Sequence, residues 1–299
     1  MKKIFQFQSI LLAIAAISLL LSATGNSPNY LSQKLPGVVR IGANIYYDQT
    51  EVNNVEWRQY MYWTIRIFGK NSDEYNATLP DTTVWTKKDA CLISYKSEYL
   101  RHMQYDFYPL VGITQKQAEG YAKWRSDKVF EKILIENHII KQDQNQNRQN
   151  HFTIEKYFAG QYQGVKPDKN FMYYPNYRLP TINEWKIALH FEDSIEHKHK
   201  AKPLPLNTDV EPCSKKQGDC VTKVTHVTSQ DMFDDISERN HPIEYLKGNV
   251  SEWTSEKNLC IGGGWADKAQ ILATQDTFHL ETVNAWTGFR NVCEWKEYK

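Results

Sequence analysis

Cysteine thiols are the first groups in this sequence that can do chemistry, because a thiolate binds soft metals, attacks substrates or forms disulfides. The chain has five cysteines, an odd number. Cys213 and Cys220 flank the polar loop SKKQGD, and a disulfide between them would close that loop. In an exported chain cysteines favour disulfides, so we expect bridges with one thiol left over.

Two histidines are the next candidates for metal chemistry. His197 and His199 lie two residues apart at what we expect to be the charged end of a helix. No third ligand is near them in the sequence, so we interpret them as part of a solvated face. The chain also contains no P-loop, GxSxG, HExxH or GxGxxG pattern.

Residues 248–265, GNVSEWTSEKNLCIGGGW, combine two tryptophans, three consecutive glycines and one carboxylate that we expect to be buried, Glu252. Glycine has no Cβ, so the backbone at 262–264 can take a positive φ or lie close against a neighbouring strand or a ligand. We favour a tight turn and a core strand, and a binding site is the alternative.

Four motifs in this order resemble the signatures of the sulfatase-modifying-factor family, whose best-known members are formylglycine-generating enzymes. They are RLPTINEW at 178–185, GNVSEW at 248–253, GGGW at 262–265 and GFR at 288–290. YAKWRSDKV at 121–129 resembles the variant found in gliding-motility lipoproteins. The resemblance implies an α+β domain with a modified C-type-lectin-like fold and much irregular structure.

The resemblance breaks down at the catalytic centre. Formylglycine-generating enzymes hold copper with two cysteines between the third and fourth motifs, because a thiolate pair suits Cu(I). Residues 266–287 contain no cysteine here. His279 is the only soft-metal ligand of the usual kind in that segment, and a single histidine does not make a copper site. We therefore expect neither copper nor a catalytic residue.

The family also binds calcium, and the resemblance places one site at the backbone carbonyls of Gly248 and Val250 and the side chain of Glu252. Calcium takes about six to eight oxygen ligands. At a fourth position the family commonly has Asn or Asp, and this chain has Tyr245. The expected calcium site is therefore degenerate, and backbone N–H groups are the alternative partners of Glu252.

The family also suggests a second disulfide. Cys260 and Cys293 lie on two segments that the family pairs near its C-terminal core, which leaves Cys91 as the odd thiol, buried and inert. Many members instead join a cysteine at the position of Ala122 to one directly after GFR. Here Asn291 follows GFR, so that bridge is absent.

Local patterns predict the elements that position these residues. Three capping boxes predict helices that begin at Asn53–Glu56, Thr114–Gln117 and, for a short helix, Thr181–Glu184. β-Branched and aromatic residues in 38–52 predict strands around a turn. Residues 141–150, KQDQNQNRQN, have no apolar side chain and are expected to form a solvated insertion.

The chain begins with a pattern typical of a signal peptide, residues 1–23, followed by a linker at 24–36 and one domain at 37–299. The apolar run 10–21 is shorter than the roughly 20 residues that a transmembrane helix needs, so no span is expected after cleavage. The protein is expected to be exported, to the periplasm, the extracellular space or the cell surface. A net charge of +1 gives no reason to expect nucleic acid or anionic lipid as a partner.

These observations support two hypotheses. The preferred one is a non-catalytic binding or scaffold module of the cell envelope, whose partner is an envelope or surface protein, a peptide or a glycan. The alternative is a metal-dependent oxidoreductase of the formylglycine-generating type with rearranged ligands. It requires Cys260, Cys293 and His279 to converge.

Overall fold

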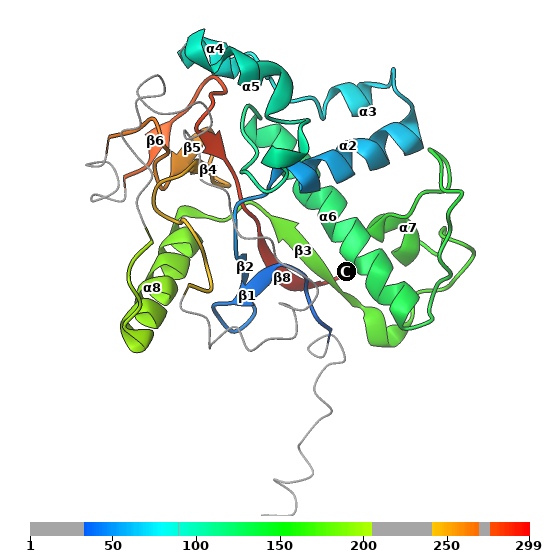
Figure 1. Cartoon of the computed structure of the whole chain (residues 1–299). Coiled ribbons are helices and arrows are strands. Elements are labelled where there is room, and N and C mark those ends of the chain that lie inside the picture. Colours follow the sequence, from blue (N-terminus) through cyan, green and yellow to red (C-terminus); the bar gives the residue numbers. More distant parts are fainter. Residues whose placement is uncertain (1–32, 89, 205–240, 269–275) are drawn as a thin grey trace, which may run out of the picture.

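The computed structural model describes residues 33–88, 90–204, 241–268 and 276–299 (Figure 1). The predicted signal peptide at 1–23, most of the linker, and both Cys213 and Cys220 lie outside the described residues.

One sheet joins the first and last described strands in the order β1-β2-β8-β3, with every neighbouring pair antiparallel. The expected strands in 38–52 are confirmed. The sheet consists of β1 (Val38–Arg40), β2 (Tyr46–Asp48), β3 (Tyr173–Arg178) and β8 (Val292–Glu297).

A second sheet has the order β6-β5-β4-β7 and contains the glycine-rich stretch. β4 pairs antiparallel with β5 and parallel with β7, so Glu252 lies opposite Ile261 on one side and Gly288 on the other. Its strands are β4 (Ser251–Trp253), β5 (Leu259–Ile261), β6 (Phe278–His279) and β7 (Thr287–Gly288).

The three predicted capping boxes are confirmed at the starts of the three longest helices of the described residues. These are α2 (Asn54–Phe68), α6 (Gln115–Glu136) and α8 (Ile182–His199). The shorter helices are α3 (Asp73–Asn76), α4 (Val84–Lys88), α5 (Ile93–Glu98) and α7 (Ile154–Phe158), with 3₁₀ turns η2 (Ala90–Leu92), η3 (Met103–Tyr105) and η4 (Lys169–Phe171). No helix in the described ranges is long and apolar enough to cross a membrane.

Helix α8 is longer than the short helix expected from RLPTINEW, because it continues to His199 over 18 residues. Its buried face extends beyond Trp185, Ala188 and Leu189 to Glu192. A carboxylate on this face carries no apolar signal, so hydrophobic periodicity does not reveal the last two turns.

The first sheet is covered on both faces, because successive strand residues point to opposite sides. On β8, Val292 packs with Trp185 and Leu189 of α8, whereas the next residue, Cys293, packs with Phe130 of α6. Figure 1 shows α8 on one side of these strands and α6 on the other. The two helices, two sheets and many irregular connections confirm the expected α+β class.

The polar insertion at 141–150 is largely exposed, but it is not wholly solvated as expected. Gln146 is buried, and its amide donates hydrogen bonds to Glu131 and to the Tyr162 hydroxyl. Arg148 forms two hydrogen bonds with Glu74, of 2.8 and 2.9 Å. An amide can be buried when partners satisfy it, which composition alone does not predict.

Candidate functional site

The glycines of GGGW serve close packing, as the favoured interpretation predicts. Gly262 has a φ of +93°, and a Cβ there would lie 2.8 Å from the Leu246 carbonyl oxygen. At Gly264 a Cβ would lie 2.3 Å from the Trp286 carbonyl oxygen. No side chain fits at such separations, so these glycines let the backbone segments of the second sheet meet.

Trp265 completes this packing and is fully buried. Its indole N–H donates to the Ala285 carbonyl at 2.8 Å. Its ring stacks on Trp85 with centroids 6.2 Å apart and an interplanar angle of 8°. The tryptophan therefore belongs to the core and does not line a ligand site.

Arg290 of the GFR motif provides the partner of Glu252. The Arg290 Nε donates to Glu252 Oε1 at 2.7 Å, and its Nη2 lies 3.6 Å from Glu51 Oε2. Asn249 donates to the other oxygen of Glu51 at 3.1 Å. The expected backbone N–H partners of Glu252 are therefore replaced by a guanidinium from another part of the chain.

Backbone carbonyls satisfy much of the rest of this guanidinium. Arg290 Nη1 donates to the carbonyls of Asp48 and Gln49, and Nη2 donates to those of Glu244 and Tyr245. These contacts tie the β2 end, the loop before β4 and the C-terminal segment together. Because Arg290 is 0% exposed, the cluster is structural and cannot meet a substrate in this state.

Two buried carboxylates share this one guanidinium, so their ionisation is costly. Burial raises the pKa of Glu51 to about 7 and that of Glu252 to about 8, although Arg290 opposes both shifts. Two ionised carboxylates beside one arginine would leave a net negative charge in a dry interior. The cluster therefore favours one bound proton near neutral pH.

This proton gives a testable pH dependence. A carboxyl with a raised folded-state pKa contributes stability that is fully present below its unfolded pKa and is lost as the pH rises through the folded value. For Glu252 this window runs from 4.5 to about 8. We therefore expect the wild type to lose stability relative to Glu252→Gln across this range, as measured by urea unfolding at several pH values. A difference that stays constant or runs the other way would contradict the assignment.

As placed, Gly248, Val250 and Glu252 do not fit a calcium ion. Glu252 Oε1, the charged ligand of the expected set, already accepts from Arg290, and the Tyr245 carbonyl accepts from the same guanidinium. A divalent cation at this carboxylate would lie beside a buried positive charge. Calcium there stays a sequence prediction without support from these contacts.

The expected Cys260–Cys293 disulfide is wrong, because both thiols are free and buried. Cys260 lies on β5 of the second sheet and Cys293 on β8 of the first. Cys91 is also not the odd thiol that we expected, because it is disulfide-bonded. Ala122 packs in the same apolar cluster as Cys293. Apolar contacts therefore join α6 to the segment after GFR, the two regions that a disulfide links in many members of the family.

The thiols and His279 do not form a metal centre. His279 is exposed on β6 and pairs with Leu259, one residue before Cys260. Burial raises the pKa of the Cys260 and Cys293 thiols, so neither is a ready thiolate. Within the described part of the chain, these three residues do not come together as a group of metal donors.

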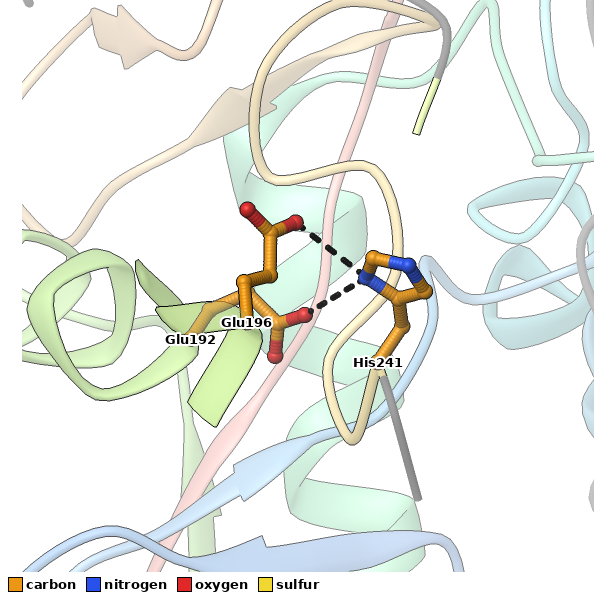
Figure 2. A group of neighbouring side chains, drawn as sticks. All are labelled: Glu192, Glu196 and His241. Carbon is orange, nitrogen blue, oxygen red and sulfur yellow. Dashed lines mark hydrogen bonds and ion pairs between the residues drawn. The ribbon is translucent and has the colours of Figure 1, made fainter. Parts of the chain in front are cut away.

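A different group of metal donors does come together on α8. One donor atom each from Glu192, Glu196 and His241 lies within 4.8 Å of the other two. His241 Nδ1 is 3.2 Å from Glu192 Oε1 and 3.1 Å from Glu196 Oε1, and Figure 2 shows both carboxylates reaching this nitrogen. His197 and His199, which we interpreted as part of a solvated face, do not belong to this group. His197 is exposed, as expected for a solvated face.

The signal that could have found this group is weak. Glu192 and Glu196 are four residues apart and therefore share a helix face. His241 lies 49 residues after Glu192 in the sequence, and the residue types between them do not predict that the histidine meets this helix face.

Comparisons with known proteins agree with the motifs. The family described as sulfatase-modifying factor enzyme 1-like domain matches residues 33–295. No curated protein sequence matches the chain.

Solved structures show remote similarity. CarF is 15% identical, covers 84% of this chain and 86% of its own, and has a TM-score of 0.42. The variable protein 1 of Treponema denticola is 13% identical, covers 84% of each chain and has a TM-score of 0.37. PvdO of Pseudomonas aeruginosa is 15% identical, covers 65% of each chain and has a TM-score of 0.29.

Proposed function

Because this chain belongs to the sulfatase-modifying factor enzyme 1-like domain family, we propose that it is a non-catalytic member, exported and used as a binding or scaffold module in the cell envelope. The family supplies the scaffold, and its activity depends on a site rather than on the fold. Export rests on the leader-like residues 1–23 of the sequence.

One observation carries the non-catalytic assignment. The segment between GGGW and GFR holds no cysteine, and the two free thiols of the described residues are buried in separate sheets. A copper oxidase needs two thiolates that face one metal and leave room for the substrate. Neither Cys260 nor Cys293 meets that requirement.

The alternative oxidoreductase needs a large rearrangement. Cys260 pairs with Trp253 and Phe278 inside the second sheet, and Cys293 pairs with Tyr46 and Tyr177 inside the first. Bringing both thiols to one metal would break pairing in both sheets. This arrangement argues against rearranged copper ligands built from the described cysteines.

A groove between α6 and β3 offers a surface for a peptide or glycan partner. Its cavity measures about 280 Å³. Aromatic rings next to charged and amide groups suit a ligand that combines apolar faces with hydrogen-bonding groups. The lining includes Lys123, Asp127, Tyr174, Asn176, Arg178 and Tyr298.

Thiol accessibility and copper affinity test this proposal together. We expect Cys260 and Cys293 to react with iodoacetamide only after unfolding, with the sites mapped by mass spectrometry. We also expect Cu(I) affinity, measured by competition with a calibrated chelator, to be unchanged in Cys260→Ala and in Cys293→Ala. Both expectations follow from the burial of the thiols.

One combination of results would contradict the non-catalytic assignment. Tight Cu(I) binding that either substitution abolishes, together with conversion of a cysteine peptide to an aldehyde, would establish the oxidoreductase instead.

A further inference from the structure

We propose that Glu192, Glu196 and His241 form a binding site for a divalent transition metal, with Zn²⁺ as the best match. Glu192 and Glu196 lie on the last turns of α8, and His241 lies in the segment before β4. The site goes beyond the proposed function, because it needs neither the copper segment nor the binding groove.

The helix sets the positions of the two carboxylates. Residues four apart lie one above the other on the same helix face. Glu192 is buried, and its Oε2 accepts from the Ile243 N–H at 2.9 Å. This bond holds the side chain so that Oε1 faces His241.

The contact of His241 Nε2 determines which nitrogen of the neutral ring carries the proton. Nε2 lies 3.1 Å from the Lys202 carbonyl oxygen, which can only accept, so Nε2 carries a proton. In the neutral ring Nδ1 then presents a lone pair to the two carboxylates. A histidine that donates one N–H to a backbone carbonyl while its other nitrogen faces anionic ligands is the usual arrangement at a metal.

The spacing of the donor atoms suits zinc. Zn–N and Zn–O bonds are about 2.0–2.2 Å, so neighbouring ligands of a tetrahedral ion lie about 3.3 Å apart. The two distances from His241 Nδ1 are 3.1 and 3.2 Å. One nitrogen and two carboxylate oxygens also suit Zn²⁺ better than Ca²⁺, which takes oxygen ligands alone.

The negative charge of the two carboxylates also favours a bound cation. Among the described residues, the only ion-pair partner of Glu192 and Glu196 is His241. The nearby Lys247 forms its ion pair with Asp193, at 3.3 Å, and not with either of the two glutamates.

A cavity of about 200 Å³ adjoins the site. Glu192 and Glu196 lie in its wall, together with apolar residues such as Leu189 and Ile243. Three protein ligands leave the fourth position of a tetrahedral zinc ion for water or for a ligand from a partner.

The test is Zn²⁺ titration by calorimetry of the full chain after metal removal with EDTA, compared with Glu192→Gln, Glu196→Gln and His241→Gln. We expect wild type to bind Zn²⁺ and each substitution to weaken that binding by at least about tenfold. Co²⁺ should give a visible d–d spectrum in wild type that the variants lose. The matched control is Asp193→Asn, which changes a neighbouring acid in the same cavity wall and should leave Zn²⁺ binding unchanged.

Two outcomes would overturn the site. Wild type without Zn²⁺ binding would mean that a proton alone joins His241 to the carboxylates. Zn²⁺ binding that is unchanged in each of the three single variants would show that the metal binds elsewhere. Because Glu196 is only half-buried, Glu196→Gln is expected to fold and keeps the comparison valid even where Glu192→Gln does not.

Discussion

Arg290→Met is expected to lower the free energy of unfolding by about 3–5 kcal/mol, which is the usual cost of removing one partner of a buried ion pair. The substitution keeps much of the side-chain length but removes the cation that Glu252 and Glu51 share. It also leaves carbonyls of the β2 end and of the loop before β4 without their donor. Urea unfolding at neutral pH measures the loss.

The control for Arg290→Met is Lys123→Met, which removes an ion pair between two exposed side chains, with Glu155. Exposed pairs contribute about 0–1 kcal/mol, so this control should change stability little. Adding Glu252→Gln to Arg290→Met should restore part of the loss, because it removes a carboxylate left without its cation. Equal effects of Arg290→Met and Lys123→Met would show that Arg290 does not hold the segments together.

Trp265→Ala is expected to cost about 3–5 kcal/mol, as is usual when a large buried aromatic side chain is removed. The indole is fully buried, and its loss would open a cavity against Trp85 and leave the Ala285 carbonyl without a donor. The measurement is again urea unfolding, with near-ultraviolet circular dichroism to report on aromatic packing.

Two variants separate these contributions of Trp265. Trp265→Phe keeps an aromatic ring and loses the N–H, so its cost should be smaller. Tyr62→Ala removes a ring that is 69% exposed and should change stability by no more than about 0.5 kcal/mol. If Trp265→Ala were no more harmful than Tyr62→Ala, the GGGW motif would have a role other than packing.

The four family motifs make structural contacts in this protein. RLPTINEW, GNVSEW, GGGW and GFR each supply a helix cap, an ion pair or a buried packing contact. Thr181 and Glu184 cap α8 while Arg178 pairs with Glu184, and Arg290 joins Glu252. These roles need no metal, so they do not depend on whether the protein is catalytic.

The helix starts were predictable because capping is local. Thr181 Oγ1 accepts from the Glu184 N–H, and Glu184 Oε2 accepts from the Thr181 N–H, so all the atoms involved lie within three residues of one another. The absence of cysteine between GGGW and GFR can also be seen in the sequence, because it concerns only the residue types between two motifs. The strands around the turn in 38–52 followed from composition.

Two of the failed predictions concern contacts between different elements of the fold. Cys260 and Cys293 were expected to form a bridge, but strand pairing places them in different sheets. Gln146 was expected in solvent and is buried against Glu131. Neither outcome is encoded near the residue itself, because each depends on which element the chain brings alongside.

The sequence by itself determined the family, the α+β class, the starts of the three longest described helices and the absence of cysteine between GGGW and GFR, since each rests on residue types or on atoms a few positions apart. Only the tertiary structure decided that Glu252 pairs with Arg290 and that His241 meets two carboxylates of α8. The first contact joins residues 38 positions apart and the second joins residues 49 positions apart. Each depends on which elements pack together, and the residue types along the chain do not specify that packing.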